Sequence, residues 1–263
     1  MPRTTKKQTS TKAIDAVLAS LPAHSVGLPA KDAVTGTTTG AGKYTILHTR
    51  EMDLYEKGAT GPGLASAVPV AAPTGDAFQG TARKAAKLSI STAKTENFAD
   101  VKDLVSSLVA DAKMIARKPQ IPITAASNRV KEEERNVHVT AFLYAASREA
   151  DNDFHLIIGR NPKDTPELYM TMELSGLPPA GALSLPQLKA ARDAFKKFFK
   201  AGAGGALPGL TYDFYQPPIP VQIDGSLFFD MSHAVGPHPG PPSLKSRMPV
   251  VWEVHPITKI VLK

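Results

Sequence analysis

The stretch LPQLKAARDAFKKFFK, residues 185 to 200, divides the regular part of this 263-residue chain. Ser184 suits the N-cap position and Pro186 the first turn, and a glycine-rich AGAGG follows the last turn. The apolar side chains recur at helical spacing and predict one buried stripe, made of Leu188, Ala191, Phe195, Phe198 and Phe199. The stretch therefore predicts an amphipathic helix that lays one face on a core.

Three segments before this helix and two after it predict β-strands. The segments before it are residues 137–146 (VHVTAFLYAA), 154–158 (FHLII) and 168–174 (LYMTMEL), and those after it are residues 219–229 (IPVQIDGSLFF) and 250–262. Asp151-Asn152 predicts a turn that joins the first two strands in a hairpin. Three strands, a helix and two strands is the order of the OB-fold, a five-stranded Greek-key barrel. A mixed α+β sheet is the competing architecture.

The chain before the first of these strands divides into two parts. Residues 1–75 mix Thr, Ala, Gly and Pro without a sustained period and predict a flexible, disordered arm, in which KYTILH (43–48) could form a short strand. Residues 76–127 form a helical lead-in, where Asn97 is expected to cap one packing helix. The predicted fold is thus mainly β with helices: an OB-like barrel over residues 128–263, an arm and one preceding helix.

Composition sets limits on function. The chain has 31 Lys and Arg against 24 Asp and Glu, a net charge of +7, which is consistent with a polyanionic partner without requiring one. The absence of cysteine excludes disulfides, thiolate metal sites and a cysteine nucleophile. No stretch approaches the roughly 20 apolar residues that a membrane span needs. The sequence therefore favours a cytoplasmic protein with no membrane partner.

Three short motifs occur in one order: DNDFHLIIG, GSLFFDMSH and VVWEVHPITKI. In this order they resemble uncharacterised bacterial proteins with an OB-like C-terminal domain that closes on a W-E-aliphatic-H-P-aliphatic-T strand. The resemblance covers roughly residues 128 to 262 and implies an OB-like fold, with no assigned activity. In those proteins the loop before the closing strand is basic and glycine-rich, whereas here PHPGPPSLKSRMP keeps only Lys245 and Arg247.

Acidic residues and histidines occur in pairs on three of the predicted elements. Asp153 and His155 share one face of a strand, and so do Glu253 and His255, because alternate residues of a strand point the same way. Asp230 and His233 leave the end of the fourth strand. If these faces coincide, His155, Asp230, His233 and His255 are the candidate ligands of a divalent metal site. The same set could also be a histidine base oriented by a carboxylate, or a contact to a ligand without chemistry. The sequence by itself favours structural pairs that close a seam over these three.

The hypotheses on function come from three classes. The first is a binding module for single-stranded nucleic acid or another extended polyanion, with Phe142, Tyr144 and Tyr169 as aromatic residues of the binding face and Lys245 and Arg247 as further ligand-binding residues. The second is a metal-assisted phosphodiesterase or nuclease that uses the His and carboxylate set, with Lys245 or Arg247 in contact with phosphate. The third is a scaffold that works through protein partners bound by the arm. The sequence alone favours the binding module.

Overall fold

The computed structural model describes residues 27–40, 43–53, 74–201, 206–236 and 238–263, and it is mainly β with helices, as predicted. The strands are β1 (Val34–Gly40), β2 (Tyr44–Thr49), β3 (Thr95–Phe98), β4 (Asn136–Arg148), β5 (Phe154–Gly159), β6 (Tyr169–Leu174), β7 (Asp213–Phe229) and β8 (Trp252–Leu262). The α-helices are α2 (Lys84–Lys87), α3 (Val101–Ser106), α4 (Asp111–Ile115), α5 (Leu185–Ala201) and α6 (Met231–Ala234). Short 3-10 turns lie at Lys31–Ala33, Lys131–Glu133 and Lys245–Arg247.

All eight strands belong to one sheet, in the order β1-β2-β7-β8-β6-β5-β4-β3, and β4 also pairs with β7. Five of the strands therefore pair in a cycle, in which each strand has two partners: β4 with β5, β5 with β6, β6 with β8, β8 with β7, and β7 with β4. The β6–β8 pairing is parallel and the other four are antiparallel. These are the five predicted strands, and α5 lies between β6 and β7 in the chain as predicted.

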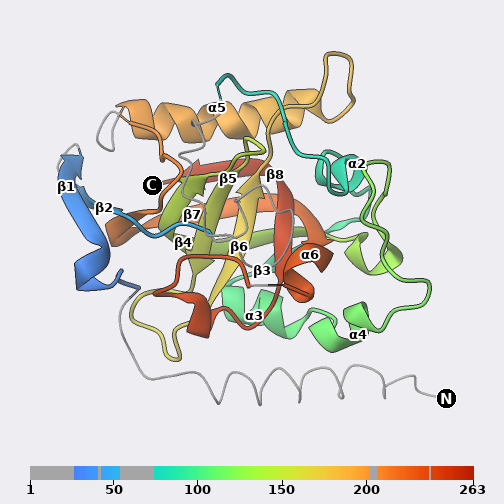
Figure 1. The fold of residues 1–263 in the computed structure, drawn as a ribbon, viewed down its shortest axis with the longest axis horizontal. Helices are drawn as coiled ribbons and strands as arrows, with labels where there is room; N and C mark the ends of the chain where they lie inside the picture. Colours follow the sequence, from blue (N-terminus) through green and yellow to red (C-terminus); the bar gives the residue numbers. More distant parts are fainter. Residues whose placement is uncertain (1–26, 41–42, 54–73, 202–205, 237) are drawn as a thin grey trace.

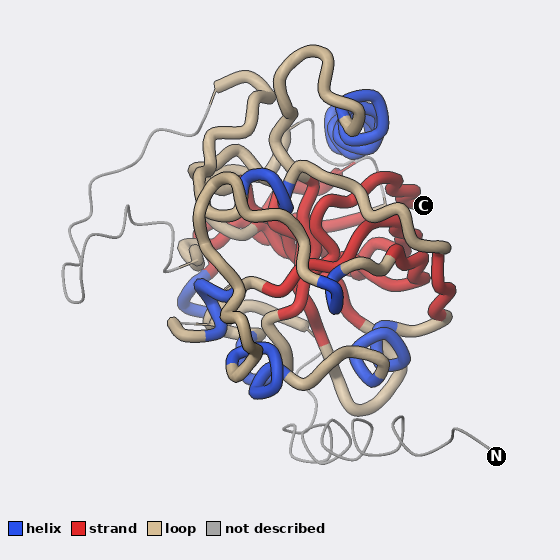
Figure 2. Tube along the Cα trace, turned by 90° about the vertical axis from the view of Figure 1, so that its right-hand side faces the viewer, coloured by secondary structure: helices blue, strands red, loops and turns tan. Residues whose placement is uncertain are grey.

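Helix α5 crosses the top of the sheet in Figure 1, and the small helices α3 and α4 lie at the opposite end. Figure 2 shows α5 nearly end-on beside the strands. The predicted apolar stripe is confirmed, because Phe195 and Phe199 are fully buried and the Phe195 ring lies 4.9 Å from that of Phe154 on β5. Within the described ranges, no helix combines the length and apolar character that a membrane crossing requires.

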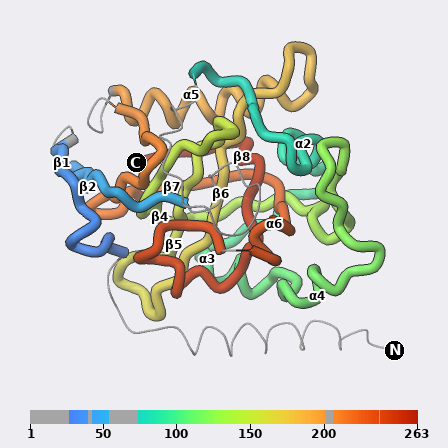
Figure 3. Tube along the Cα trace, viewed as in Figure 1, coloured from blue at the N-terminus to red at the C-terminus, as the bar shows by residue number. Residues whose placement is uncertain are grey.

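The prediction of a flexible arm is wrong for residues 34–40 and 44–49, whereas the short strand expected at KYTILH is confirmed as β2. Strands β1 and β2 form an antiparallel hairpin, and β2 pairs with the first part of β7, beside which it lies in Figure 3. Ile46 is 3% exposed and belongs to the main core. Sequence periodicity could not reveal this, because the partner strand lies far along the chain. Residues 1–26, 41–42 and 54–73 of the predicted arm lie outside the described residues.

The single packing helix predicted from Asn97 is also corrected. Asn97 lies in β3, which pairs in parallel with β4, and two short helices, α3 and α4, follow with Leu108 and Val109 between them. The N-cap of α3 is Asp100, whose Oδ1 accepts a hydrogen bond from the Lys102 backbone N–H at 2.9 Å. The helix therefore begins three residues later than predicted, after the Asp100 cap, and Asn97 itself belongs to a paired strand.

Asp111 joins α4 to the segment before β8, because its Oδ2 accepts a hydrogen bond from the Val251 N–H at 3.0 Å. Burial raises the pKa of this carboxyl from 3.8 to about 6, although the Val251 hydrogen bond opposes the shift. Since the folded-state pKa lies above the unfolded one, the stabilisation by the bound proton is complete only below the unfolded pKa and is lost as pH rises through about 6.

We therefore expect Asp111→Asn to stabilise the protein by about 1 to 3 kcal/mol at about pH 8, and by less at about pH 5. Urea unfolding of both proteins at the two pH values measures the difference. An effect that is equal at both pH values would contradict the assignment.

Candidate metal centre

The registers of β5, β6 and β8 place three ionisable side chains in a row. His155 on β5 pairs with Glu173 on β6. In the parallel β6–β8 pair, Thr171 pairs with Glu253. Two residues further along both strands, Glu173 therefore lies beside His255. His255 Nδ1 lies 2.7 Å from Glu173 Oε2 and 3.4 Å from Glu253 Oε2. The prediction that Glu253 and His255 share a face is confirmed.

Asp153 completes this row from the β4–β5 turn, which the sequence predicted at Asp151-Asn152. Asn152 adopts φ +78°, a conformation that asparagine tolerates better than most residues. Asp153 Oδ1 accepts a hydrogen bond from the Gly176 N–H at 2.5 Å, and Oδ2 lies 3.3 Å from His255 Nε2. Ligand atoms of Asp153, Glu173 and His255 lie within 4.8 Å of one another, and we call these residues the inner triad.

The second group lies where β7 ends and α6 begins. Asp230 is the N-cap of α6, where its Oδ1 accepts hydrogen bonds from the Ser232 and His233 N–H groups. Its Oδ2 lies 2.8 Å from His233 Nδ1. Glu253 on β8 is the antiparallel partner of Phe228 on β7, which lies two residues before Asp230. Asp230, His233 and Glu253 also place ligand atoms within 4.8 Å of one another and form what we call the pocket triad.

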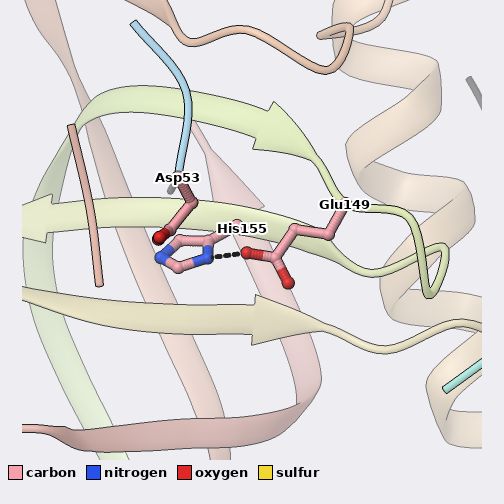
Figure 4. A group of neighbouring side chains, drawn as sticks. All are labelled: Asp53, Glu149 and His155. Carbon is pink, nitrogen blue, oxygen red and sulfur yellow. Dashed lines mark hydrogen bonds and ion pairs between the residues drawn. The ribbon is translucent and has the colours of Figure 1, made fainter. Parts of the chain in front are cut away.

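The third group surrounds His155, as Figure 4 shows. The His155 Nδ1 atom is hydrogen-bonded to Glu149, which follows β4, and the Asp53 carboxylate lies on the other side of the imidazole. His155 Nε2 also lies 3.2 Å from the Thr171 hydroxyl. Ligand atoms of Asp53, Glu149 and His155 lie within 4.8 Å of one another, and we call these residues the His155 triad.

A pocket of about 160 Å³ opens beside these groups. Its lining includes Asp230 and His233 of the pocket triad, Glu149 of the His155 triad, and the basic side chains of Arg83 and Lys87. The Lys87 Nζ atom lies 3.5 Å from Asp151 Oδ2 and 4.0 Å from Glu173 Oε2. The pocket thus joins solvent-accessible space to the buried histidine and carboxylate groups.

Among the buried carboxyl groups, two have a raised pKa and two have a lowered pKa. Burial, together with the charges of Asp151 and Glu173, raises the pKa of Asp153 well above its usual value. Burial and the Glu173 and Asp230 charges do the same to the pKa of Glu253. Burial alone would raise the pKa of Glu173, but His255 and Lys87 hold it well below its usual value. Similarly, His233 keeps the pKa of Asp230 low against the effect of burial.

The four predicted metal ligands therefore lie in three adjoining groups. Asp230 and His233 lie together, whereas His155 and His255 belong to different triads that Glu173 connects, 3.7 Å from His155 Nδ1. The sequence prediction missed Glu173 as well as Asp53, Glu149 and Lys87. Glu173 carried a signal, since a carboxylate interrupts the apolar strand LYMTMEL, but the register of β5 against β6 was needed to interpret it.

The structure corrects two of the three predicted stacking residues, Tyr144 and Tyr169. Tyr144 and Tyr169 are 2% and 1% exposed and pack edge to face with ring centroids 4.8 Å apart. Phe142 is partly buried against the same apolar cluster. Because the two tyrosine rings are covered by protein, they offer no open face to a base.

The two basic residues predicted to contact phosphate lie in the turn before β8. Arg247 is 7% exposed, and its Nε lies 3.1 Å from Glu167 Oε2, so its charge is already neutralised within the fold. Lys245 is partly exposed on the same turn. Neither residue is among those that line the pocket beside the three triads.

Comparisons with known proteins give no relative for this chain. No protein-family model, no curated protein and no solved structure matches it. The arrangement of the side chains is therefore the basis for any functional conclusion.

Proposed function

We propose that this protein is a divalent-metal-dependent phosphodiesterase whose pocket triad holds the cation. The observation that supports the proposal best is the position of this triad: Asp230 and His233 line the pocket, and Glu253 lies behind them. A cation held there would be buried on one side and open to a substrate on the other. Catalytic metal sites need such an open coordination position.

The donor atoms of the pocket triad fit a divalent cation. One imidazole and two carboxylates form a set that suits Zn²⁺, Mn²⁺ or Fe²⁺. Glu253 is fully buried, yet its Oε1 atom has no hydrogen-bond partner among the described residues. A buried carboxylate oxygen left in this way calls for an explanation, and a bound cation supplies one.

The pocket with a bound cation favours a phosphoryl group by its charge and its size. Its lining combines the Lys87 ammonium with the carboxylates of Glu149, Asp151 and Asp230, and Arg83 is paired with Glu133. A divalent cation in the pocket triad would balance these carboxylates, and together with Lys87 it would suit an anion more than a neutral ester. Its volume of about 160 Å³ is below the range of roughly 300 to 1,000 Å³ for sites that enclose whole small molecules. We infer that the phosphate group enters the pocket while the rest of the substrate stays outside.

The chain's own residues supply the remaining catalytic functions. A divalent cation held by Asp230, His233 and Glu253 would lower the pKa of water and polarise the phosphoryl group. Glu149 lines the pocket and is oriented by its hydrogen bond to His155, so it is placed to accept a proton from the attacking water. Lys87 is placed to balance the negative charge that develops on the phosphoryl oxygens.

An OB-like barrel is part of this proposal. Its support is the cyclic pairing of β4, β5, β6, β8 and β7, with the helix α5 between the third and fourth of these strands in chain order. The binding of single-stranded nucleic acid and the scaffold role stay predictions from the sequence.

Hydrolysis of bis(p-nitrophenyl) phosphate by metal-stripped protein, with and without added Mn²⁺, tests the proposal. We expect hydrolysis to rise to saturation with Mn²⁺, to stop when chelator is added and to return with excess metal. p-Nitrophenyl acetate, a neutral ester, serves as the control and should show no comparable metal dependence. A rate that is the same with millimolar Mn²⁺ and with chelator would overturn the proposal.

A further inference from the structure

The inner triad has the features of a cation site of its own. Asp153, Glu173 and His255 are 0%, 2% and 0% exposed. Their ligand atoms come from β6, β8 and the residue before β5, so a rigid sheet fixes their separation. As in the pocket triad, two carboxylates and one imidazole are combined, a set that suits Mn²⁺ or Zn²⁺.

Unsatisfied polar atoms lie inside this triad. Asp153 Oδ2 and His255 Nε2 are buried without a hydrogen-bond partner among the described residues, and they lie 3.3 Å apart. Glu173 Oε2 lies 2.7 Å from His255 Nδ1, on the other side of the same imidazole ring. Buried polar atoms are nearly always satisfied, so an unpartnered carboxylate oxygen beside an unpartnered imidazole nitrogen indicates a missing ligand. Both atoms are metal ligands, which specifies a cation.

The inner triad adjoins the pocket triad through Glu253. Its Oε2 atom lies 3.4 Å from His255 Nδ1, while the same carboxylate belongs to the pocket triad. We infer that the inner triad binds a second divalent cation close to the pocket triad, with the His255 imidazole and the Glu253 carboxylate between the two ions. This second site can exist whether or not the pocket triad is catalytic.

Lys87 acts as the built-in counter-charge of the inner triad. Its Nζ atom is 4.0 Å from Glu173 Oε2, and Glu173 is one of the charges that raise the pKa of Lys87 well above its usual value despite burial. An ammonium group at this distance repels a divalent cation bound to the same carboxylate. Lys87 therefore weakens binding at the inner triad, and its removal should strengthen it.

Equilibrium dialysis of the metal-stripped chain against Mn²⁺, followed by elemental analysis, counts the sites. We expect two Mn²⁺ ions per wild-type chain and one in each of Glu173→Gln and Asp230→Asn. Asp224→Asn, which changes a carboxylate paired with His138 away from the triads, is the matched control and should keep two. Spin coupling between the two Mn²⁺ ions in the electron paramagnetic resonance spectrum, present only in the wild type and this control, would show that they are neighbours.

The same counts separate the two proposals. One ion per wild-type chain that is lost in Asp230→Asn but kept in Glu173→Gln overturns the second site and leaves the proposed function intact. One ion that is lost in Glu173→Gln but kept in Asp230→Asn leaves the inner site intact and removes the metal basis of the proposed function. Two ions without spin coupling would refute the adjacency through Glu253. No bound ion in the folded wild type would overturn both proposals.

Lys87→Met gives a test in the opposite direction, because a gain in affinity cannot come from misfolding. We expect the inner ion to bind at least about tenfold more tightly once the ammonium charge is gone. Lys84→Met, on the same short helix α2, is the matched control and should leave the affinity unchanged. Unchanged or weaker Mn²⁺ binding in Lys87→Met would contradict the inferred position of the second cation.

Discussion

Replacing Glu133 with alanine is expected to lower the free energy of unfolding by about 3 to 5 kcal/mol, because it leaves a buried charge without its partner. Glu133 is fully buried, and its two oxygens accept hydrogen bonds from Arg83 Nη1 and Nη2 at 2.6 and 2.7 Å. The same carboxylate accepts hydrogen bonds from the Val130 and Phe229 N–H groups at 2.7 and 2.8 Å.

The effect extends to the pocket, because Phe229 directly precedes Asp230. Arg83 lines the pocket, and its positive φ of 50° is a conformation that few non-glycine residues adopt without support. Urea unfolding of Glu133→Ala measures the loss, and Glu134→Ala, at an exposed neighbouring position, is the control, with an expected change of no more than about 0.5 kcal/mol. Equal losses for the two variants would show that the buried pair has no special role.

The largest expected effect on function is that of Asp230→Asn. We expect the Mn²⁺-dependent rate to fall by at least about 100-fold, because a charged ligand of the pocket triad becomes neutral. The side-chain oxygen of asparagine can still accept the hydrogen bonds from the Ser232 and His233 N–H groups that cap α6. The loss of rate should therefore occur in a folded protein.

Initial rates at saturating substrate over a range of Mn²⁺ concentrations distinguish lost affinity from lost turnover, and a thermal melt confirms folding. Asp224→Asn again serves as control, since it neutralises an aspartate that is also paired with a histidine, His138. Wild-type rates in Asp230→Asn at every Mn²⁺ concentration would exclude the pocket triad as the catalytic metal site.

Much of the local structure was determined by the sequence itself. The five strands β4 to β8, the helix α5 and the turn at Asp151-Asn152 follow from periodicity and turn residues, which act over a few neighbouring positions. The same local rule placed Glu253 and His255 on one face, because side chains alternate along every strand. The sequence also placed Asp230 and His233 together at the end of the fourth predicted strand, where the helix α6, which was not predicted, brings them into contact.

Only the tertiary structure decided what lies opposite these residues. The register between distant strands places Glu173 between His155 and His255. The pairing of β2 with β7 brings β2 into the sheet, and Asp53, which follows β2 in the chain, lies beside His155. Packing likewise covers Tyr144 and Tyr169, which alternation alone left available for stacking. The physical reason is that a strand's own pattern fixes which residues share a face, whereas its partners are chosen by contacts between segments far apart in the chain.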